Sequence, residues 1–280
     1  MSFDFANVSL QKVREYWDRR PCNLRHSPAP LGSRQYFDEV EQRKYFVEPH
    51  IPGFAAFPRW AGQRVLEIGC GIGTDTINFA RAGALVTAVD LSPRSLELAR
   101  QRAGLFGFTD RIQFVEADAE RLSEYVEPAA YDLVYSFGVI HHSPRPDKIL
   151  QEIRRHFIAP RGILKVMVYH RRSWKVLGIL LREAYGAWWR LDDAIARHSE
   201  AQTGCPITYT YTRRRGTELL ADAGFDVSAA AVDHIFPYRV KDYVEYRYVT
   251  AAPFRWLPHG EMRFLERRLG WHLCLTACPR

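Results

Sequence analysis

Three glycines at alternate positions follow an acidic residue in the segment VLEIGCGIGTD, which spans residues 65–75. The glycines are Gly69, Gly71 and Gly73, and the acid is Glu67. Glycine allows a tight turn and lets a ligand approach the main chain closely. A dinucleotide-binding turn has the spacing GxGxxG and offers bare helix N–H groups to a pyrophosphate. The spacing here is GxGxG with a carboxylate nearby, which favours a ligand that carries an ammonium group and no phosphate.

Strands and helices alternate around this turn. Short apolar runs predict five strands, at 64–69, 84–90, 111–118, 131–138 and 162–170. Helices are predicted between them, over 74–83, 91–104 and 147–157, and Ser92 before Pro93 is typical of a helix start. This alternation predicts βαβ units with right-handed crossovers and a mostly parallel sheet. The turn would then lie at the carboxyl edge of the sheet, where such folds bind ligands.

The regions on either side of this core are expected to be additions to it. Before the core, helices are predicted over Asp4–Arg20 and Gln35–Glu48. After it, the pattern predicts one or two helices over 173–199, a turn or short strand at 205–211, a helix over 213–223, a sixth strand at 225–234, an irregular aromatic stretch at 236–258, a helix over 261–269 and a final strand at 271–278. The expected parts are an N-terminal helical extension (1–60), a ligand-binding core (61–170), a helical insertion (171–212) and a C-terminal part of the sheet (213–280).

Composition narrows the class of protein. The 280 residues are 47% hydrophobic and 25% charged, which excludes wholesale disorder and a collagen-like repeat. The five cysteines are an odd number with no CxxC pair or Cys/His metal spacing, so we expect reduced thiols and no metal site. We expect no secretory signal and no membrane-spanning helix, because the first residues are charged and no apolar run reaches about 18 residues. A cytoplasmic location follows as an expectation.

The net charge of +7 is unevenly distributed. The first 140 residues hold 16 Lys and Arg against 18 Asp and Glu, so the positive charge lies in the second half. A basic half can bind nucleic acid or an acidic substrate, and it can equally be an Arg-rich solvated surface.

The core resembles the class I S-adenosylmethionine-dependent methyltransferases, in particular bacterial members that act on small molecules. The segments VLEIGCGIGTD, VTAVDLSP, VEADAERL and YDLVYSFGVIHHSP occur in the family's order between residues 64 and 170, and YFVEPHIPGFAAFPRW before them is a weaker match. One departure is Pro160-Arg161-Gly162, where the family usually has two glycines; we expect a loop there, before the fifth strand. The resemblance implies an α/β, Rossmann-like fold, with a mostly parallel seven-stranded sheet and helices on both faces, and S-adenosyl-L-methionine as cofactor.

The family's cofactor-binding roles transfer to positions that match its motifs. Asp90 would accept the ribose hydroxyls, and Asp118 would accept the adenine amino group. The full set implied by the resemblance is Glu67, Gly69, Gly71, Gly73, Thr74, Asp75, Asp90, Leu91, Asp118, Ala119, Ser136, Phe137 and Gly138. Plainer roles remain open, because Asp90 and Asp118 could cap helices and Asp75 could simply favour a helix dipole.

Methyl transfer from a sulfonium is an in-line displacement, so the protein must chiefly position the reactants and exclude water. A base is needed only where the acceptor loses a proton. Candidates beyond the fourth and fifth strands are His141, His170 and Tyr169, although such rings also pack or orient loops. An aromatic lid over the substrate could include Tyr16, Tyr36, Tyr45, His142 and Trp174, or these side chains could be ordinary core.

The sequence therefore predicts transfer of a methyl group to a small-molecule acceptor. An RNA methyltransferase is the alternative favoured by the basic half and by Arg213-Arg214-Arg215, but no NPPY- or DPPY-type tetrapeptide follows the fourth strand. A cofactor-binding protein without catalysis is a further alternative, and the glycine spacing disfavours a nicotinamide-dependent oxidoreductase. Nucleic acid is thus a disfavoured partner, while a homo-oligomer, with Trp188-Trp189 as a partner surface, is left open.

Overall fold

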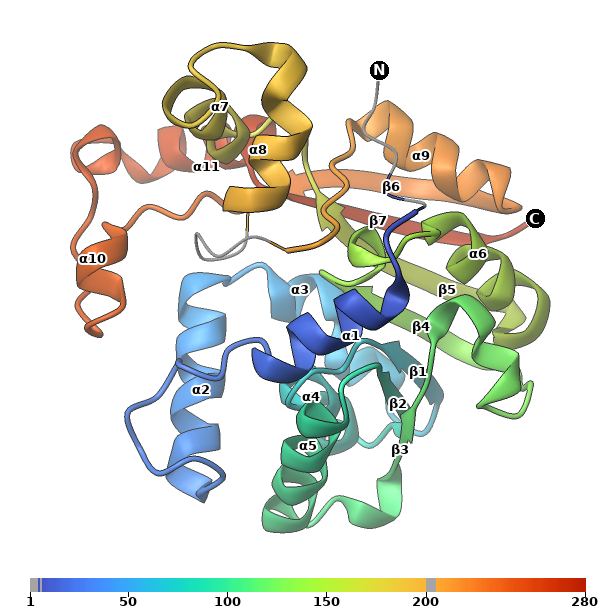
Figure 1. The fold of residues 1–280 in the computed structure, drawn as a ribbon. Coiled ribbons are helices and arrows are strands. Elements are labelled where there is room, and N and C mark those ends of the chain that lie inside the picture. The colour runs from blue at the N-terminus through green and yellow to red at the C-terminus, as the bar shows by residue number, and fades with distance from the viewer. Residues whose placement is uncertain (1–4, 6, 200–204) are drawn as a thin grey trace.

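A seven-stranded sheet runs through the computed structural model, which describes residues 5, 7–199 and 205–280 (Figure 1). The strand order is β3-β2-β1-β4-β5-β7-β6. Strands β1 to β5 pair in parallel, whereas β7 is antiparallel to both of its neighbours. The predicted mostly parallel sheet and Rossmann-like α/β class are confirmed.

The strands are apolar runs that contribute alternate residues to two cores. They are β1 (Arg64–Ile68), β2 (Leu85–Asp90), β3 (Ile112–Glu116), β4 (Tyr131–Phe137), β5 (Ile158–Tyr169), β6 (Phe225–Asp233) and β7 (His272–Pro279). In β1, Val65 joins one buried cluster and Leu66 the other. Because successive strand side chains point to opposite faces, the two clusters lie on opposite faces of the sheet.

Helices cover both faces. One core contains residues of α4 (Thr74–Arg81) and α5 (Pro93–Phe106), and the other contains residues of α6 (Pro146–Glu152) and α9 (Arg213–Asp222). Ser92 caps α5 as predicted, since its Oγ accepts the Ser95 amide at 3.0 Å. The remaining core turns are η2 (Thr109–Arg111), η3 (Ala119–Glu124), η4 (Ile140–His142) and η5 (Ile153–Phe157).

The N-terminal extension comprises α1 (Leu10–Arg19), α2 (Arg34–Val47), α3 (Ile51–Ala55) and η1 (Phe57–Trp60). It packs mainly against α4 and α5 of the core. The predicted start of the first helix was wrong: the helix begins at Leu10, after Ser9 in an extended conformation, and Asp4 lies outside the described residues. Buried Arg102 of α5 holds α2 in place by donating to Glu41 Oε2 at 2.8 Å and to the Phe37 carbonyl at 3.2 Å.

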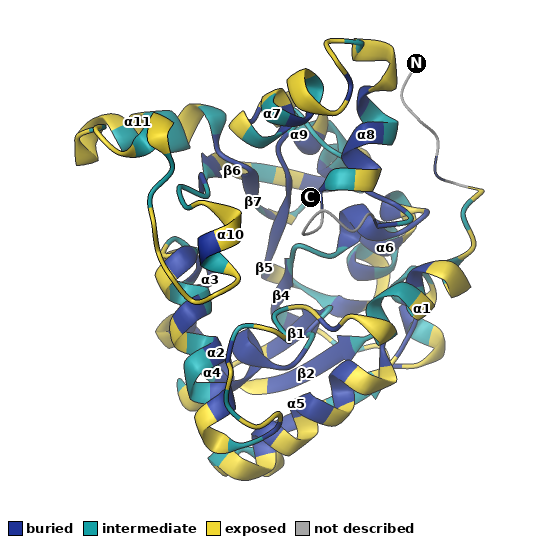
Figure 2. Ribbon diagram, turned by 60° about the vertical axis from the view of Figure 1, so that its left-hand side comes forward, coloured by how far each residue is buried: buried dark blue, intermediate teal, exposed yellow. Residues whose placement is uncertain are grey.

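The additions after β5 lie over the ends of β5 and β7. They comprise α7 (Trp174–Arg182), η6 (Trp188–Arg190) and α8 (Leu191–His198), followed after α9 by α10 (Val240–Tyr243), η7 (Ala252–Phe254) and α11 (His259–Leu269). One buried cluster joins Val176 and Ile179 of α7 with Ile195 of α8 and Met167 of β5. The outer surfaces of α7 and α11 are largely exposed (Figure 2). Within the described residues, no helix is long and apolar enough to cross a bilayer.

The loop predicted at Pro160-Arg161-Gly162 was wrong, because these residues lie inside β5. Tyr131 pairs with Ile158 and Leu133 pairs with Ile163, so five residues of β5 match two of β4. The extra residues form an irregularity in the strand. Gly162 is required there, since a Cβ would lie 2.7 Å from the Tyr131 carbonyl oxygen.

Candidate active site

A cavity of about 830 Å³ opens at the carboxyl edge of the parallel strands. One wall is the glycine turn after β1 together with the ends of β2, β3 and β4. The opposite wall comes from α1, α2, α7 and residues 234–254. Segments distant in sequence thus enclose one space, with the predicted cofactor turn on one side and the added helices on the other.

The glycine turn needs its glycines for different reasons. All three have positive φ, at 79° for Gly69, 54° for Gly71 and 77° for Gly73. A Cβ on Gly69 would lie 2.2 Å from Val139, whereas a Cβ on Gly71 would meet no atom of the described protein within 4 Å. Gly69 and Gly71 line the cavity, and Gly73 instead packs against α5. Gly71 is therefore where a ligand can approach the main chain most closely.

Asp90 lies at the end of β2 and lines the cavity. Its Oδ2 accepts the Gly71 amide at 2.8 Å, and its Oδ1 accepts the Ser92 amide at 2.9 Å. Burial raises the pKa of this carboxyl, and these amides oppose that effect. The two contacts fix the carboxylate toward the cavity, and each oxygen keeps a lone pair for a further donor.

The third strand brings Asp118 to the same cavity, with Ala119 beside it and Leu91 from the β2 end. Asp118 also caps η3, because its Oδ1 accepts the Glu120 amide at 2.9 Å. The capping role and the cavity position therefore coexist at this residue.

Two predicted cofactor carboxylates lie behind the turn, outside the cavity lining. Asp75 accepts hydrogen bonds from Lys44 Nζ at 2.6 Å and from the hydroxyls of Tyr45 and Tyr135, both at 2.9 Å. Glu67 accepts from the Thr76 hydroxyl at 2.5 Å, and burial with the nearby Asp75 raises its pKa to about 8. These contacts fix the base of the turn; Thr74, at the start of α4, does line the cavity.

At the end of β4, Phe137 and Gly138 line the cavity while Ser136 is fully buried.

Of the two predicted bases at the end of β5, only one lines the cavity. Tyr169 lines the cavity and stacks on Trp271 with ring centroids 4.1 Å apart. His170 lies outside the lining, with Nδ1 3.1 Å from the Gly270 carbonyl oxygen.

His141 is also outside the lining and completely buried. Neither of its ring nitrogens has a hydrogen-bond partner among the described residues. Burial lowers its pKa well below the usual value, with His142 contributing, so the ring is neutral. It lies between its neighbour His142 and Tyr169, at ring distances of 4.2 and 4.0 Å, which is the packing role weighed for these histidines.

The predicted aromatic lid divides between cavity and core. His142 and Trp174 line the cavity, whereas Tyr36 lies in a core cluster with its hydroxyl donating to the Leu24 carbonyl. Tyr45 is behind the turn on Asp75, and Tyr16 lies at a separate smaller hollow. The neighbour of Tyr16, Trp17, lines the main cavity, since adjacent residues on a helix face different directions.

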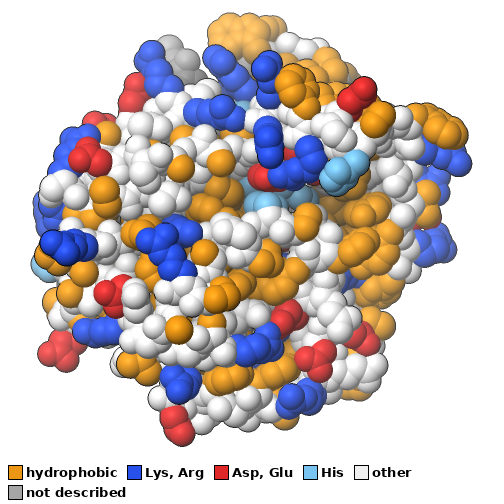
Figure 3. Space-filling model, turned by 180° about the vertical axis from the view of Figure 1, so that it is seen from behind, with side chains coloured by type: hydrophobic (Ala, Val, Ile, Leu, Met, Phe, Trp, Pro, Cys, Tyr) orange, Lys and Arg blue, Asp and Glu red, His pale blue; other side chains and the backbone are white. Residues whose placement is uncertain are grey.

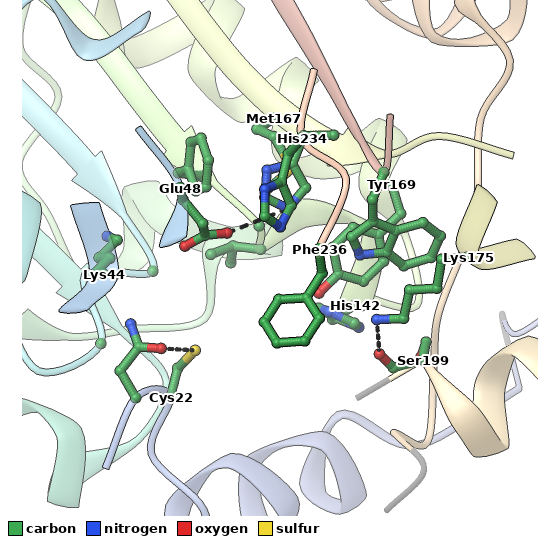
Figure 4. A pocket seen from close by; sticks show the side chains of 18 of the residues that line it. Cys22, Lys44, Glu48, His142, Met167, Tyr169, Lys175, Ser199, His234 and Phe236 are labelled. Carbon is green, nitrogen blue, oxygen red and sulfur yellow. Dashed lines mark hydrogen bonds and ion pairs between the residues drawn. The ribbon is translucent and has the colours of Figure 1, made fainter. Parts of the chain in front are cut away.

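Sequence reasoning missed a polar cluster made of Glu48, His234 and His272, which line the cavity, and of His50, which contacts His272 from outside the lining. Figure 4 shows Glu48 and His234 pointing toward one another, with Phe236 and Tyr169 beside them. Burial lowers the pKa of His50 to about 4 and that of His234 to about 3. A signal existed in YFVEPHIPGFAAFPRW, which contains Glu48 and His50, but nothing in the sequence links them to positions 234 and 272.

Comparison with known proteins places the core in a family. Residues 65–162 match the model of a methyltransferase domain. Over 101 residues the chain is 39% identical to the ubiquinone biosynthesis O-methyltransferase of Paracidovorax citrulli, covering 36% of this chain and 41% of that protein. It is 33% identical over 104 residues to a sterol 4-C-methyltransferase of Caenorhabditis elegans, covering 37% of this chain and 30% of that protein.

The chain thus spans well under half the length of these curated relatives. Residues 65–162 form a class I S-adenosylmethionine-dependent methyltransferase domain. The fold agrees over nearly the whole chain with magnesium protoporphyrin IX methyltransferase from Synechocystis PCC 6803, solved with bound S-adenosylhomocysteine: the TM-score is 0.59 at 16% identity, covering 97% and 100% of the two chains.

The methyltransferase domain supplies one wall of the cavity and the rest of the chain supplies the other. Gly69, Asp90 and Asp118 lie within the matched range, while Glu48, His234 and His272 lie outside it. The first group thus lies in the matched methyltransferase domain, and the second lies in the added segments.

Proposed function

We propose that this protein transfers the methyl group of S-adenosylmethionine to a small, largely apolar acceptor held in the same cavity. The observation that carries the proposal is that one cavity contains both the family's glycine turn and the aromatic wall of the added helices. A volume of about 830 Å³ is within the range of small-molecule sites.

The donor's position follows from the fixed polar groups of the methyltransferase domain. Asp90 is suited to accept the ribose hydroxyls, because its carboxylate is fixed by two amides and faces the cavity. Asp118, with Ala119, lies where adenine would extend. The sulfonium would then lie near Phe137 and Gly138, and its methyl group would face the added wall.

The acceptor's chemistry follows from that wall. Trp17, Phe236, Tyr169 and Trp271 contribute ring surface to the cavity, which suits a flat apolar molecule. In the transfer, an acceptor atom attacks the methyl carbon, the carbon–sulfur bond breaks, and the electron pair returns to sulfur to give S-adenosylhomocysteine. Positioning the two molecules in line and excluding water are the protein's main contributions.

The arrangement of the basic side chains disfavours the RNA alternative. Arg214 and Arg215 both pair with Glu218, and Arg213 donates to the Arg267 carbonyl. On the face seen in Figure 3, basic and acidic side chains alternate with apolar ones instead of forming one basic stripe. A polymer-binding trough requires a continuous basic surface.

The test is a two-step measurement on the purified chain. Calorimetry with S-adenosylhomocysteine should show one site per chain, and labelled S-adenosylmethionine should then deliver its methyl group to a member of a panel of quinols, phenols and sterols. Donor binding without transfer to any panel member would support the non-catalytic alternative, and transfer to RNA alone would support the nucleic-acid alternative.

A further inference from the structure

Three side chains from distant parts of the sequence meet where the cavity borders the β6–β7 ends. Glu48 follows α2, His234 follows β6, and His272 begins β7. Their ligand atoms, one carboxylate oxygen and two ring nitrogens, all lie within 4.8 Å of one another. All three residues line the cavity, and Figure 4 labels Glu48 and His234.

The position of His234 is fixed by its backbone and by the residues beside it. His234 has a φ of 69°, in the left-handed region, which histidine adopts more often than most residues other than glycine. The turn is fixed because Asp233 accepts two hydrogen bonds from Arg263, at 3.0 and 3.1 Å, and the Trp271 amide donates to the His234 carbonyl at 2.7 Å.

His272 is oriented by a further histidine. Its Nδ1 is 3.0 Å from Nε2 of His50, and its Nε2 is 3.5 Å from Oε1 of Glu48. When Nδ1–H donates to His50, the lone pair of Nε2 faces the carboxylate. Ligating histidines are commonly oriented in this way, with the second ring nitrogen bound to another protein group.

We propose that Glu48, His234 and His272 bind one divalent first-row transition metal ion, with His50 orienting His272. Two imidazoles and one carboxylate are the donor set of open zinc sites, which leave a fourth position for water or substrate. A tetrahedral site with such bonds has donor atoms roughly 3.4 Å apart.

The carboxylate of Glu48 would supply negative charge to a bound cation. Among the cationic side chains nearby, Arg263 pairs with Asp233 and Lys44 pairs with Asp75. Lys175 donates to the Ser199 carbonyl.

The cluster lies beside the region assigned to the sulfonium, because the ring of His272 contacts Phe137 with centroids 5.4 Å apart. An acceptor hydroxyl bound there would ionise more readily and lose its proton to water, as water does on zinc. The oxygen would then attack the donor's methyl carbon as the carbon–sulfur bond breaks. This use of the ion rests on the proposed function, whereas binding of the ion does not.

The experiment titrates metal-stripped full-length protein with Co²⁺ alone, followed by competition with Zn²⁺, in the absence of donor and acceptor. We expect one Co²⁺ per chain, with the intense visible absorption of a low-coordinate site, and displacement by Zn²⁺. Glu48→Gln and His234→Asn should each weaken binding by at least about 100-fold, and His50→Asn by about 10- to 100-fold. Asparagine is chosen at 234 because it tolerates positive φ.

The control is His156→Gln, which removes a half-exposed histidine of η5 away from the cavity and should leave binding unchanged. S-adenosylhomocysteine affinity, measured on every variant, reports folding of the donor site. Absence of stoichiometric Co²⁺ or Zn²⁺ binding by the wild-type chain would overturn the proposal, as would binding that survives both Glu48→Gln and His234→Asn. Either result would leave donor binding, and so the proposed function, intact.

Discussion

Asp90→Asn tests the proposed donor site at the residue whose two carboxylate oxygens both accept backbone hydrogen bonds. The carboxylate accepts two amides, from Gly71 at 2.8 Å and from Ser92 at 2.9 Å. An asparagine has one acceptor oxygen, so its NH₂ group must face one of these N–H groups. The substitution therefore disturbs the glycine turn and removes one of two acceptors for the ribose hydroxyls.

The expected loss follows from the energy of a hydrogen bond to a charged group, about 1.5–3 kcal/mol. Losing one such contact weakens donor binding by about 10- to 150-fold, since 1.4 kcal/mol corresponds to a factor of ten. The amide left without an acceptor should also lower the free energy of unfolding by about 1–3 kcal/mol. Binding and stability must therefore both be measured.

Calorimetry with S-adenosylhomocysteine and urea denaturation give these two quantities. Asp226→Asn is the matched control, because Asp226 is exposed, pairs with Arg280 and lies far from the cavity. Gly71→Ala provides a second variant, whose added methyl meets no described protein atom within 4 Å. Because the φ of Gly71 is 54°, this variant also strains the turn, and its urea midpoint is measured beside its donor affinity. If donor affinity stays within twofold of wild type in both Asp90→Asn and Gly71→Ala, the assignment of the donor site is refuted.

Three other predictions concern stability. Gly69→Ala should lower the free energy of unfolding by about 2–5 kcal/mol, because Gly69 has a positive φ and the new methyl would clash with Val139. Gly104→Ala lies inside α5 with open space around it and should raise the free energy of unfolding by about 0.5–1 kcal/mol. Urea denaturation midpoints measure both effects, and equal effects would contradict this difference. Arg102→Ala should cost about 3–5 kcal/mol in urea unfolding, because it removes the donor to Thr74 Oγ1 and to the Phe37 carbonyl and leaves Glu41 with Arg81 as its partner. A loss under 1 kcal/mol would count against that role. Burial raises the pKa of Glu67 from 4.5 to about 8, so between these pH values the folded state binds more protons than the unfolded state. The free energy of unfolding should therefore fall as pH rises through this range. Glu67→Gln should remove that part of the pH dependence, and an unchanged pH dependence would contradict the prediction.

The core was predictable because its signals are local. Alternating apolar runs and a glycine turn set the strands and the first turn, and Ser92-Pro93 marked the start of α5. The irregularity at Pro160 was not predictable, since a proline and a glycine together ordinarily indicate a loop, and only the pairing of β4 with β5 shows that the strand continues.

The candidate site also contains residues whose positions could be predicted from the sequence and residues whose positions could not. Gly71, Asp90 and Asp118 belong to contiguous motifs and line the cavity, and their roles toward the cofactor stay predictions. Glu67 and Asp75 were assigned to the cofactor from the same motif, but they lie outside the cavity lining, where they accept hydrogen bonds from Thr76 and from Lys44. Motif spacing places a residue on an element, and the direction of its side chain depends on partners from elsewhere in the chain.

The added wall could not be assembled from sequence at all. His234 and His272 become neighbours because β6 and β7 pair antiparallel with Asp233 opposite His272, and Glu48 joins them only after α2 packs on the core. Nothing in the spacing of positions 48, 234 and 272 encodes that meeting.

The central claim is that one cavity holds the donor at the glycine turn and leaves room for the acceptor against the added wall. A crystal structure with S-adenosylhomocysteine tests it most directly. The account predicts the ribose at Asp90, the adenine near Asp118, the sulfur near Phe137, and free space bordered by Glu48 and His234. Density for the ligand elsewhere, or a bound ligand that fills the space at Glu48 and His234, would contradict it.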